Sequence, residues 1–364
     1  MRVLFLDQFS ELGGAQQCLL DLVDGMPRGE LHAALPSRGP LVEALEHRHV
    51  AVHKFFDLQY TNGRKTLRDL YRFALDTPRL AARVRALIRR HRIDLVYVNG
   101  PRMLAPAAMA APKALVFHSH SYLGKRYASL VARLCLRNAR VIASSRFVAL
   151  PLPQHNLRVI YNGVRELPFQ VHRGGDGRPW RIGIVGRIAP EKGQTDFLRM
   201  AHVLQHRGLN AEYRIHGAPM FAKAGYMEEV VERSRGLNVV FAGWSNDIAG
   251  VFAELDLLAV PSAAIDATPR VIMEAFAAGV PVAAYPSGGV PELIEDGVSG
   301  VLTSSSSAVS LADAIEGLLR GPERLDAIAR AARSQWETRF TVQRYAREVQ
   351  EFLATTQYGS KARQ

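Results

Sequence analysis

The sequence alternates short runs of apolar residues with longer amphipathic stretches, and this alternation constrains the fold more than any other feature. The apolar runs are continuous, which is typical of parallel strands that helices cover on both faces. The pattern occurs in two successive sets. The first set is Val3–Leu6, Leu31–Leu35, Val50–Phe55, Leu95–Val98, Ala114–Phe117, Val141–Ser144 and Val159–Tyr161. The second set is Ile182–Val185, Ala211–Ile215, Val239–Ala242, Leu257–Val260, Pro281–Ala284 and Val301–Leu302.

Two such sets predict an α/β protein of two doubly wound, Rossmann-like domains in series. A polar, turn-rich stretch at Val171–Pro179 separates the sets, so we expect one domain over 1–170 and another over 171–341. In sheets of this kind, ligands bind at the carboxyl ends of the strands. A cleft between the domains is the expected active site.

Composition narrows the class of protein. Of the 364 residues, 48% are apolar and 22% are charged, as in soluble globular proteins. The longest charge-free apolar stretch, near Met103–Pro112, is shorter than the roughly 20 residues that a spanning helix needs. The first residues lack the features of a signal peptide, so we expect a cytoplasmic protein. Cys18 and Cys135 lie far apart without zinc or redox spacing, and we expect two buried thiols.

Positive charge is concentrated in one segment. The chain carries a net charge of +12, and residues 64–92 contain ten Lys and Arg but two Asp. Apolar residues recur there at helical spacing. The segment therefore fits either a solvated helix face or contact with an anionic partner, such as an acidic membrane surface or a phosphorylated acceptor. Nucleic acid is not expected, because no nucleic-acid-binding motif accompanies the charge.

In each set, a glycine-containing loop follows the first strand. Gly13 and Gly14 open a helix, whose free backbone amides could bind a phosphate, although adjacent glycines are equally typical of a simple tight turn. In Gly186–Gly193, Arg187 and Lys192 lie five residues apart and could bind phosphate oxygens. The alternative is a solvated turn in which Lys192 pairs with Glu191.

A pair of acids follows the strand at Leu257–Val260. Asp266 lies in a loop, and Glu274 lies in the first part of the next helix, with seven residues between them. The chain resembles the family 4 glycosyltransferases over nearly its whole length. The resemblance is carried by the double glycine near the start, Val116–His118, Val159–Val164, Gly186–Gly193, the acid pair and Gly288–Glu292. The resemblance implies the two-domain GT-B fold and sugar transfer from a nucleotide sugar with retention of anomeric configuration.

The resemblance also implies a role for each site residue. Glu274 would accept hydrogen bonds from the ribose and Asp266 would hold the sugar hydroxyls. The amides of Arg270 and Val271 would face the diphosphate with Arg187 and Lys192, so the protein's own cations would stabilise the leaving group without a metal or other cofactor. Gly13 and Gly14 would contribute to donor binding. The residues implied on the acceptor side are Gln16, His118 and His120, with His118 facing the transferred sugar.

The sequence departs from the family pattern in three places. The first acid of the pair is usually Glu, so Asp266 could select another sugar or pose. Pro269 cannot donate an amide, which leaves the phosphates to later N–H groups. The run His216–Pro219 lacks a second glycine. The last helix, about 342–364, is similar to the segment by which relatives return to the first domain.

Several identities stay open. A nucleoside diphosphate sugar is the expected donor, with UDP as the best guess for the nucleotide, and the acceptor hydroxyl could belong to a lipid, a polysaccharide or a natural product. A nucleotide-sugar epimerase of the same architecture is an alternative, as is a catalytically silent nucleotide-sugar binding module. Asp266 and Glu274 would suit a glycoside hydrolase less well, because Arg187 and Lys192 have no role in that reaction. No Asp-x-Asp motif for a metal-bound diphosphate occurs in the sequence.

Overall fold

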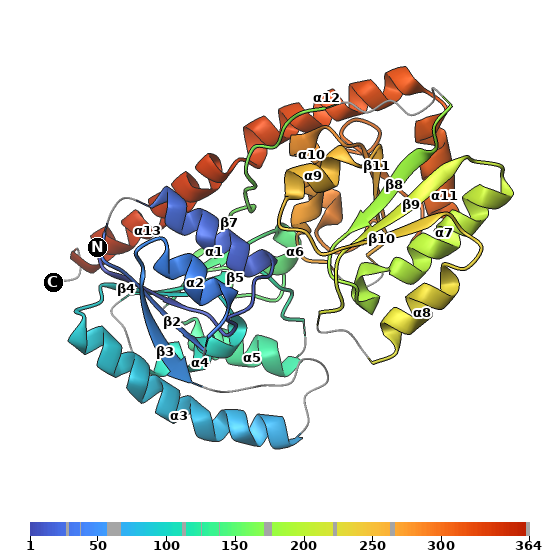
Figure 1. Ribbon diagram of the computed structural model, residues 1–364. Coiled ribbons are helices and arrows are strands. Elements are labelled where there is room, and N and C mark those ends of the chain that lie inside the picture. Colours follow the sequence, from blue (N-terminus) through green and yellow to red (C-terminus); the bar gives the residue numbers. More distant parts are fainter. Residues whose placement is uncertain are drawn as a thin grey trace. The chain divides into compact units, whose positions relative to one another are not determined.

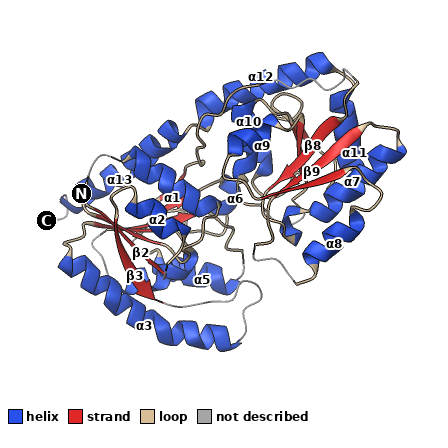
Figure 2. Ribbon diagram, in the orientation of Figure 1, coloured by secondary structure: helices blue, strands red, loops and turns tan. Residues whose placement is uncertain are grey.

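The chain forms two units that are each organised around one parallel sheet. A computed structural model describes residues 1–26, 29–36, 38–56, 67–110, 114–124, 126–137, 139–170, 177–220, 224–262 and 266–361. Unit 1 comprises Met1–Gly163 and Val342–Gln364, and unit 2 comprises Val164–Thr341. Helices cover both faces of each sheet (Figure 2). The chain therefore has the α/β, GT-B type of architecture that the sequence predicts.

Among the described residues, unit 1 has a seven-stranded sheet in the order β3-β2-β1-β4-β5-β6-β7, with every neighbouring pair parallel. The strand order reverses between β1 and β4, which is where this fold class binds ligands. The strands are β1 (Val3–Leu6), β2 (Leu31–Pro36), β3 (Ala51–Phe56), β4 (Leu95–Val98), β5 (Leu115–Ser119), β6 (Arg140–Ala143) and β7 (Leu157–Val159).

The helices of unit 1 lie in two layers (Figure 1). Helix α13 packs on α1, and its side chains Tyr345, Val349 and Phe352 join the core beneath the sheet. Helices α3, α4 and α5 pack side by side on the other face. The helices are α1 (Gly14–Gly25), α2 (Pro40–Glu46), α3 (Leu67–Arg90), α4 (Leu104–Met109), α5 (Arg126–Cys135), α6 (Arg146–Ala149) and α13 (Val342–Lys361), with a 3-10 turn η1 at Pro101–Met103.

Unit 2 repeats this arrangement with a six-stranded parallel sheet in the order β10-β9-β8-β11-β12-β13, again counted over the described residues. Its order reverses between β8 and β11. The strands are β8 (Trp180–Val185), β9 (Ala211–His216), β10 (Val239–Gly243), β11 (Leu257–Val260), β12 (Val282–Ala284) and β13 (Val301–Leu302).

The helices of unit 2 also form two layers. Helices α7, α8 and α11 pack on one face, whereas α9, α10 and α12 pack on the other. The helices are α7 (Gln194–His206), α8 (Tyr226–Arg233), α9 (Ile248–Ala253), α10 (Arg270–Ala278), α11 (Ala308–Leu319) and α12 (Pro322–Arg339), with 3-10 turns η2 (Pro190–Lys192) and η3 (Val290–Glu292).

The boundary between the units lies earlier than the sequence suggests. Residues 164–170 cluster with unit 2, because the Gln170 amide donates to the Ala278 carbonyl at 3.0 Å and Phe169 packs against Gly279. The polar stretch expected to be the linker falls largely at 171–176, outside the described residues. The last predicted helix is α13, which belongs to unit 1.

Two smaller expectations have different outcomes. Cys18 is fully buried in unit 1, but Cys135 at the end of α5 is only half-buried, so the prediction of two buried thiols is wrong for Cys135. In the described part of the chain, no helix combines the length and apolar character needed to cross a bilayer.

Candidate active site

The predicted donor residues other than Gly13 and Gly14 gather at the carboxyl edge of the unit 2 sheet. The loop containing Arg187 and Lys192 follows β8, and the loop containing Asp266 follows β11. These strands are neighbours at the point where the strand order reverses. Their carboxyl ends therefore bring the two loops together at the point where this fold class binds its ligands.

The loop after β8 is held in shape by its own backbone and by one buried side chain. Gln194 is 1% exposed; its Nε2 donates to the Arg187 carbonyl at 2.8 Å, and its Oε1 accepts from the Ala189 amide at 3.3 Å. At its end, Gly193 has φ +77°, and a Cβ there would lie 1.9 Å from the Pro261 carbonyl oxygen. Glycine is required because the loop lies directly against the segment after β11.

Lys192 forms an ion pair with Asp266 across the two loops. The Nζ–Oδ2 distance is 2.7 Å, and the side chains are 24% and 14% exposed. Ser262 Oγ donates to the same Oδ2 at 3.0 Å. The suggested alternative, in which Lys192 pairs with Glu191, is wrong, because Glu191 Oε1 instead accepts from Arg187 Nη2 at 3.1 Å. The structure thus brings a predicted phosphate ligand together with the predicted sugar ligand.

The double glycine after β12 positions Asp266. The Gly289 amide donates to the Asp266 carbonyl at 2.8 Å. Gly288 has φ +59°, and a Cβ on it would lie 2.1 Å from that carbonyl oxygen. Any larger residue at 288 would displace the acid loop, so this motif supports the site through its backbone.

Helix α10 carries the second acid. The helix begins at Arg270, directly after Pro269, and Glu274 lies one turn further on. Glu274 Oε1 lies 3.6 Å from Arg270 Nε, and both side chains are largely but not completely buried. The amides of Arg270 and Val271 are in the first turn, where an α-helix offers no internal acceptor and carries partial positive charge.

The carboxyl edge of the unit 1 sheet is built differently, from a buried hydrogen-bond network. Asp7 follows β1 and is 0% exposed. Its carboxylate accepts from Asn99 Nδ2 at 2.7 Å and from Gln16 Nε2 at 3.0 Å. Burial raises the pKa of Asp7, and the hydrogen bonds from Asn99 and Gln16 oppose that rise. The side-chain amide of Gln16, a residue predicted on the acceptor side, thus donates to a buried acid.

His118 and His120 extend this network from the end of β5. The His118 ring is 0% exposed, and its Nδ1 lies 2.6 Å from the Tyr97 hydroxyl. Burial lowers the pKa of His118, and the nearby His120 lowers it further. The centroid of the tilted His120 ring lies 3.9 Å from that of His118. His120 is only partly buried, and its Nε2 lies 3.0 Å from Asn99 Oδ1.

The predicted glycines open α1 at the same edge. Gly13 precedes the first helical residue, Gly14, and its backbone is extended. A Cβ on Gly13 would lie 3.0 Å from Gln16 Oε1, so the position is crowded by the Asp7 network. Neither glycine has the left-handed backbone of a position that requires glycine, since Gly13 has φ −130° and Gly14 is helical.

The chain matches two related family descriptions, one in each unit. Residues 12–166 match "Glycosyltransferase Family 4", and residues 179–321 match "Glycosyl transferases group 1". Together the two matches identify a glycosyltransferase of the group 1 and family 4 type. The resemblance inferred from the sequence motifs is therefore confirmed, and glycosyltransferase is the class of enzyme to which the site belongs.

Curated relatives share this class. The chain is 27% identical over 255 residues to the amylovoran biosynthesis glycosyltransferase AmsK of Erwinia amylovora, covering 65% of this chain and 62% of that protein. It is 25% identical over 324 residues to a GDP-mannose-dependent α-(1-6)-phosphatidylinositol monomannoside mannosyltransferase of Mycobacterium tuberculosis, covering 78% and 81%.

A solved structure is similar over nearly its whole length. The structure of Anabaena Alr3699/HepE in complex with UDP and glucose has a TM-score of 0.82 and 27% identity, and covers 97% of this chain and 99% of that one. The sucrose-phosphate synthase of Thermosynechococcus elongatus has a TM-score of 0.79 at 16% identity, which supports the fold alone. The GT-B expectation is confirmed.

Sequence reasoning missed several residues at the two edges. Asp7 and Asn99 each follow an apolar strand directly, and this position was the signal that could have revealed them. Ser262 and Gln194 gave no comparable signal, because their partners depend on loop conformation. Trp244, 50% exposed just after β10, is a further large aromatic side chain at the carboxyl edge of unit 2.

Proposed function

We propose that this glycosyltransferase moves a sugar from a UDP-sugar to an acceptor hydroxyl with retention of configuration and without a metal ion. The observation that carries the proposal is the ion pair between Lys192 and Asp266 beside Arg187, at the crevice of unit 2. An ion pair that is still partly exposed can exchange partners when a charged ligand arrives. The donor would offer each residue a new partner: its diphosphate would bind Lys192, and its sugar hydroxyls would donate to Asp266.

Diphosphate binding would use Arg187 and Lys192 together with the first turn of α10. Arg187 presents a planar fork of donors, whereas Lys192 adds a mobile point charge. Arg187 pairs with Glu191, and Lys192 pairs with Asp266. The amides of Arg270 and Val271 would add backbone donors and the positive end of the helix.

The remainder of the donor would contact three side chains. When Lys192 turns to the phosphate, Asp266 Oδ2 becomes able to accept from a sugar hydroxyl, with Ser262 holding the carboxylate in place. Glu274 would accept from the ribose hydroxyls, because an ionised carboxylate offers several acceptor sites. The exposed indole of Trp244 offers a stacking surface for the base.

The proposed chemical step makes use of this arrangement. The bond between the anomeric carbon and the diphosphate oxygen breaks, and the acceptor oxygen bonds to the anomeric carbon on the same face. The acceptor proton passes to the leaving phosphate. Negative charge grows on the diphosphate during this step, so Arg187 and Lys192 stabilise the transition state more than the ground state.

The acceptor side is assigned to the carboxyl edge of unit 1. Our sequence-based prediction puts His118 against the sugar, but its ring is fully buried behind His120. We therefore assign the ligand contact to the partly exposed His120, and a positioning role to His118 and Gln16. Replacing His120 with Ala should then raise KM or lower kcat with little loss of stability, whereas His118→Ala should lower the unfolding temperature as well.

We infer the classes of donor and acceptor from the molecules that similar proteins are named for or were solved with. The Anabaena protein was solved with UDP and with UDP-glucose, and it supports a UDP-sugar donor here. The mycobacterial relative is named for GDP-mannose and a phosphatidylinositol mannoside, which supports an amphiphilic acceptor as one candidate. A polysaccharide precursor is the other, by analogy with the amylovoran enzyme.

The face formed by α3, α4 and α5 is a candidate contact with an anionic membrane. Tyr71 and Leu75 on α3 are 67% and 50% exposed, and Leu130 and Leu134 on α5 are 60% and 61% exposed. Exposed arginines of α3 accompany them, namely Arg72, Arg79, Arg89 and Arg90. Arg64 and Lys65, which belong to the predicted basic segment, lie outside the described residues. Apolar side chains among cations suit an anionic lipid surface.

Vesicle sedimentation tests this contact. We expect binding to vesicles that contain anionic lipid, weakening at high salt, and a reduction in the double variant Leu130→Ser/Leu134→Ser. Equal binding to neutral and anionic vesicles would contradict the proposed charge-dependent contact.

The central experiment is a donor and acceptor panel. The chain is incubated with UDP- and GDP-sugars, with and without lipid and polysaccharide acceptors, and products are analysed by mass spectrometry and by NMR of the anomeric proton. The proposal predicts acceptor-dependent release of UDP, an unchanged anomeric configuration and no loss of rate with a chelator. Acceptor-independent change at a sugar carbon would instead support the epimerase, and saturable binding without turnover would support the silent binding module.

A further inference from the structure

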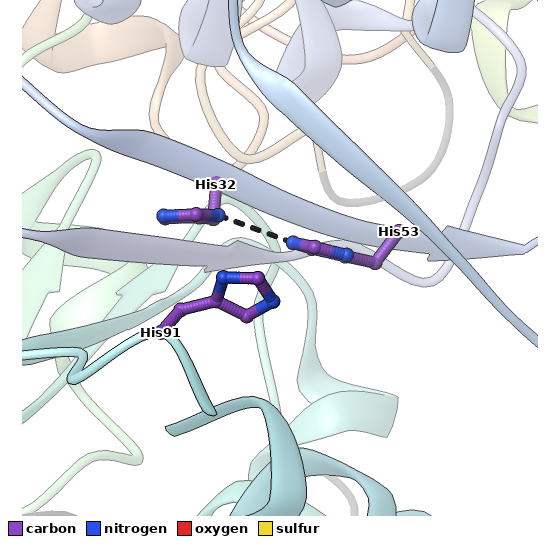
Figure 3. A group of neighbouring side chains, drawn as sticks. All are labelled: His32, His53 and His91. Carbon is purple, nitrogen blue, oxygen red and sulfur yellow. Dashed lines mark hydrogen bonds between the residues drawn. The ribbon is translucent and has the colours of Figure 1, made fainter. Parts of the chain in front are cut away.

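Three histidines from separate parts of the sequence meet in unit 1, away from the proposed active site. His32 is the second residue of β2, His53 the third residue of β3, and His91 follows the end of α3. Figure 3 shows the three rings facing one another, with His91 against the other two. The strand pairing explains part of this, because His32 is in register with Ala51 and His53 with Ala34, which puts both side chains on one face of the sheet.

The ring nitrogens of the three histidines are close enough together to bind one metal ion. His32 Nδ1 lies 3.1 Å from His53 Nε2, and the ligand nitrogens of all three histidines lie within 4.8 Å of one another. The ring centroids of His32 and His53 are each 4.7 Å from that of His91. In a tetrahedral zinc site with Zn–N bonds of about 2.0–2.1 Å, neighbouring nitrogens are about 3.3 Å apart, so small ring movements suffice.

Charged side chains near the three rings act in both directions on a bound cation. Neutral imidazole keeps the lone pair that binds a metal. Arg2 and Arg90 act against a cation here, whereas Glu30, which pairs with Arg2, acts for one.

We propose that His32, His53 and His91 form a binding site for a divalent transition metal ion of the zinc class. Three histidine ligands suit zinc and its neighbours, and they leave a fourth position for water. Access is available, because His53 and His91 are only partly buried while His32 is 8% exposed. Among the described residues, this is the place where at least three metal-ligating side chains come together.

The site's position indicates a structural role. Among the described strands, β3 lies at the edge of the sheet and pairs only with β2. An ion bound to these histidines would connect β3, β2 and the segment between α3 and β4. His32 and His91 lie toward the amino ends of the strands, whereas the proposed acceptor edge lies at their carboxyl ends. The ion would therefore stabilise unit 1 without entering the transfer reaction.

The test uses the full chain without a histidine tag, stripped with a chelator and titrated with zinc chloride. We expect saturable binding of one Zn²⁺ by calorimetry, a melting temperature raised by about 5 °C or more at saturation, and no comparable effect of Mg²⁺. Cobalt(II) should give the visible absorption of a tetrahedral site. His91→Ala and His53→Ala should each weaken binding by more than the ten- to hundredfold that loss of an outer partner costs.

His155→Ala is the matched control, since His155 is exposed and bonds to the Arg137 carbonyl elsewhere in unit 1. It should bind zinc as the unaltered chain does. His91→Gln provides a second variant in case alanine disturbs folding. Absence of saturable zinc binding, or equal affinity in the His91 and His155 variants, would overturn the proposal.

Discussion

Both sheets reverse their strand order at the equivalent position, and each presents polar side chains at its carboxyl edge there. The polar side chains of the two edges differ in burial and in charge. In unit 1 the edge is a buried network in which Asp7 is 0% exposed and accepts hydrogen bonds from amide side chains. In unit 2 the edge consists of paired charges, and Lys192 and Asp266 stay partly exposed. The comparison teaches that the fold determines where a ligand binds. The burial of the polar side chains at that edge determines their role: buried groups stabilise the structure, and partly exposed groups can exchange their partners for a ligand.

Unit 2 also contains a structural acid that sharpens this contrast. Asp256 precedes β11 at the amino edge, its side chain is 1% exposed, and it accepts from Arg178 and Arg181. Burial opposes its ionisation, but these hydrogen bonds outweigh burial and lower its pKa below the ordinary 3.8. Asp256 is thus a buried charged group that its hydrogen bonds to two arginines stabilise.

The largest expected effect is on stability, from Asp256→Asn. Leaving two arginines without their buried partner should cost about 3–5 kcal/mol in the free energy of unfolding at neutral pH. Because the folded pKa is lowered, this stabilisation is present above about pH 4 and is lost as the pH falls through the folded value. Denaturant unfolding between pH 2 and 7 should show a shallower acid loss in the variant. Asp313→Asn, on an exposed ion pair, is the control. An equal loss in the two variants would contradict the structural role.

Next in size is Lys192→Ala, which should lower kcat/KM about a hundredfold or more. The reason is that the diphosphate would lose a positive charge as it leaves, a loss of about 3 kcal/mol of transition-state stabilisation. Initial-rate kinetics on the donor identified by the panel provide the measurement. The matched control is Arg235→Ala, whose side chain is 76% exposed and pairs with Glu232 at the other edge of the sheet. A rate within twofold of the unaltered enzyme would remove Lys192 from the mechanism.

Glu274→Gln should weaken nucleotide binding about ten- to hundredfold, since a hydrogen bond to a charged acceptor contributes about 1.5–3 kcal/mol. The loss should appear for UDP and for uridine alike, because the ribose is common to both. Calorimetry on the two ligands measures it, with Glu232→Gln on the exposed part of α8 as control. Unchanged affinity for uridine would show that Glu274 does not contact the ribose.

The smallest expected effect is the loss of stability on replacing Asp7 at the carboxyl edge of unit 1. Asp7→Ala should lower the free energy of unfolding by about 1–3 kcal/mol, because the amides of Asn99 and Gln16 would lose a buried acceptor. Donor affinity should stay unchanged. Thermal unfolding and UDP binding are both measured, with Asp24→Ala on the surface pair with Arg48 for reference. A loss of donor affinity without a loss of stability would reverse the comparison between the two edges.

The strands of the fold could be predicted because burial on both faces leaves a plain signal in the chain. Each of the apolar runs identified in the sequence coincides with a strand, from Val3–Leu6 to Val301–Leu302, with ends that shift by a residue or two. Helix ends and the boundary between the units leave a weaker signal in the sequence. Residues 164–170 join unit 2 through contacts with Ala278 and Gly279, more than a hundred residues later.

The site could be predicted in its residues but not in its pairings. Motif spacing pointed to Lys192 and to Asp266, yet their ion pair joins positions 74 residues apart through two loops. The loop shapes depend on Gly193 and Gly288, whose positive φ values no local pattern specifies. Similarly, the direction of a strand side chain decides that His118 is buried while His120 stays partly exposed.

The most direct test of the account compares the affinities of UDP and uridine in the unaltered chain and in Lys192→Ala. If the edge of unit 2 holds a diphosphate, UDP should bind at least about a hundredfold more tightly than uridine, and the variant should lose most of that preference while binding uridine normally. An unaltered ratio in the variant would contradict the central claim.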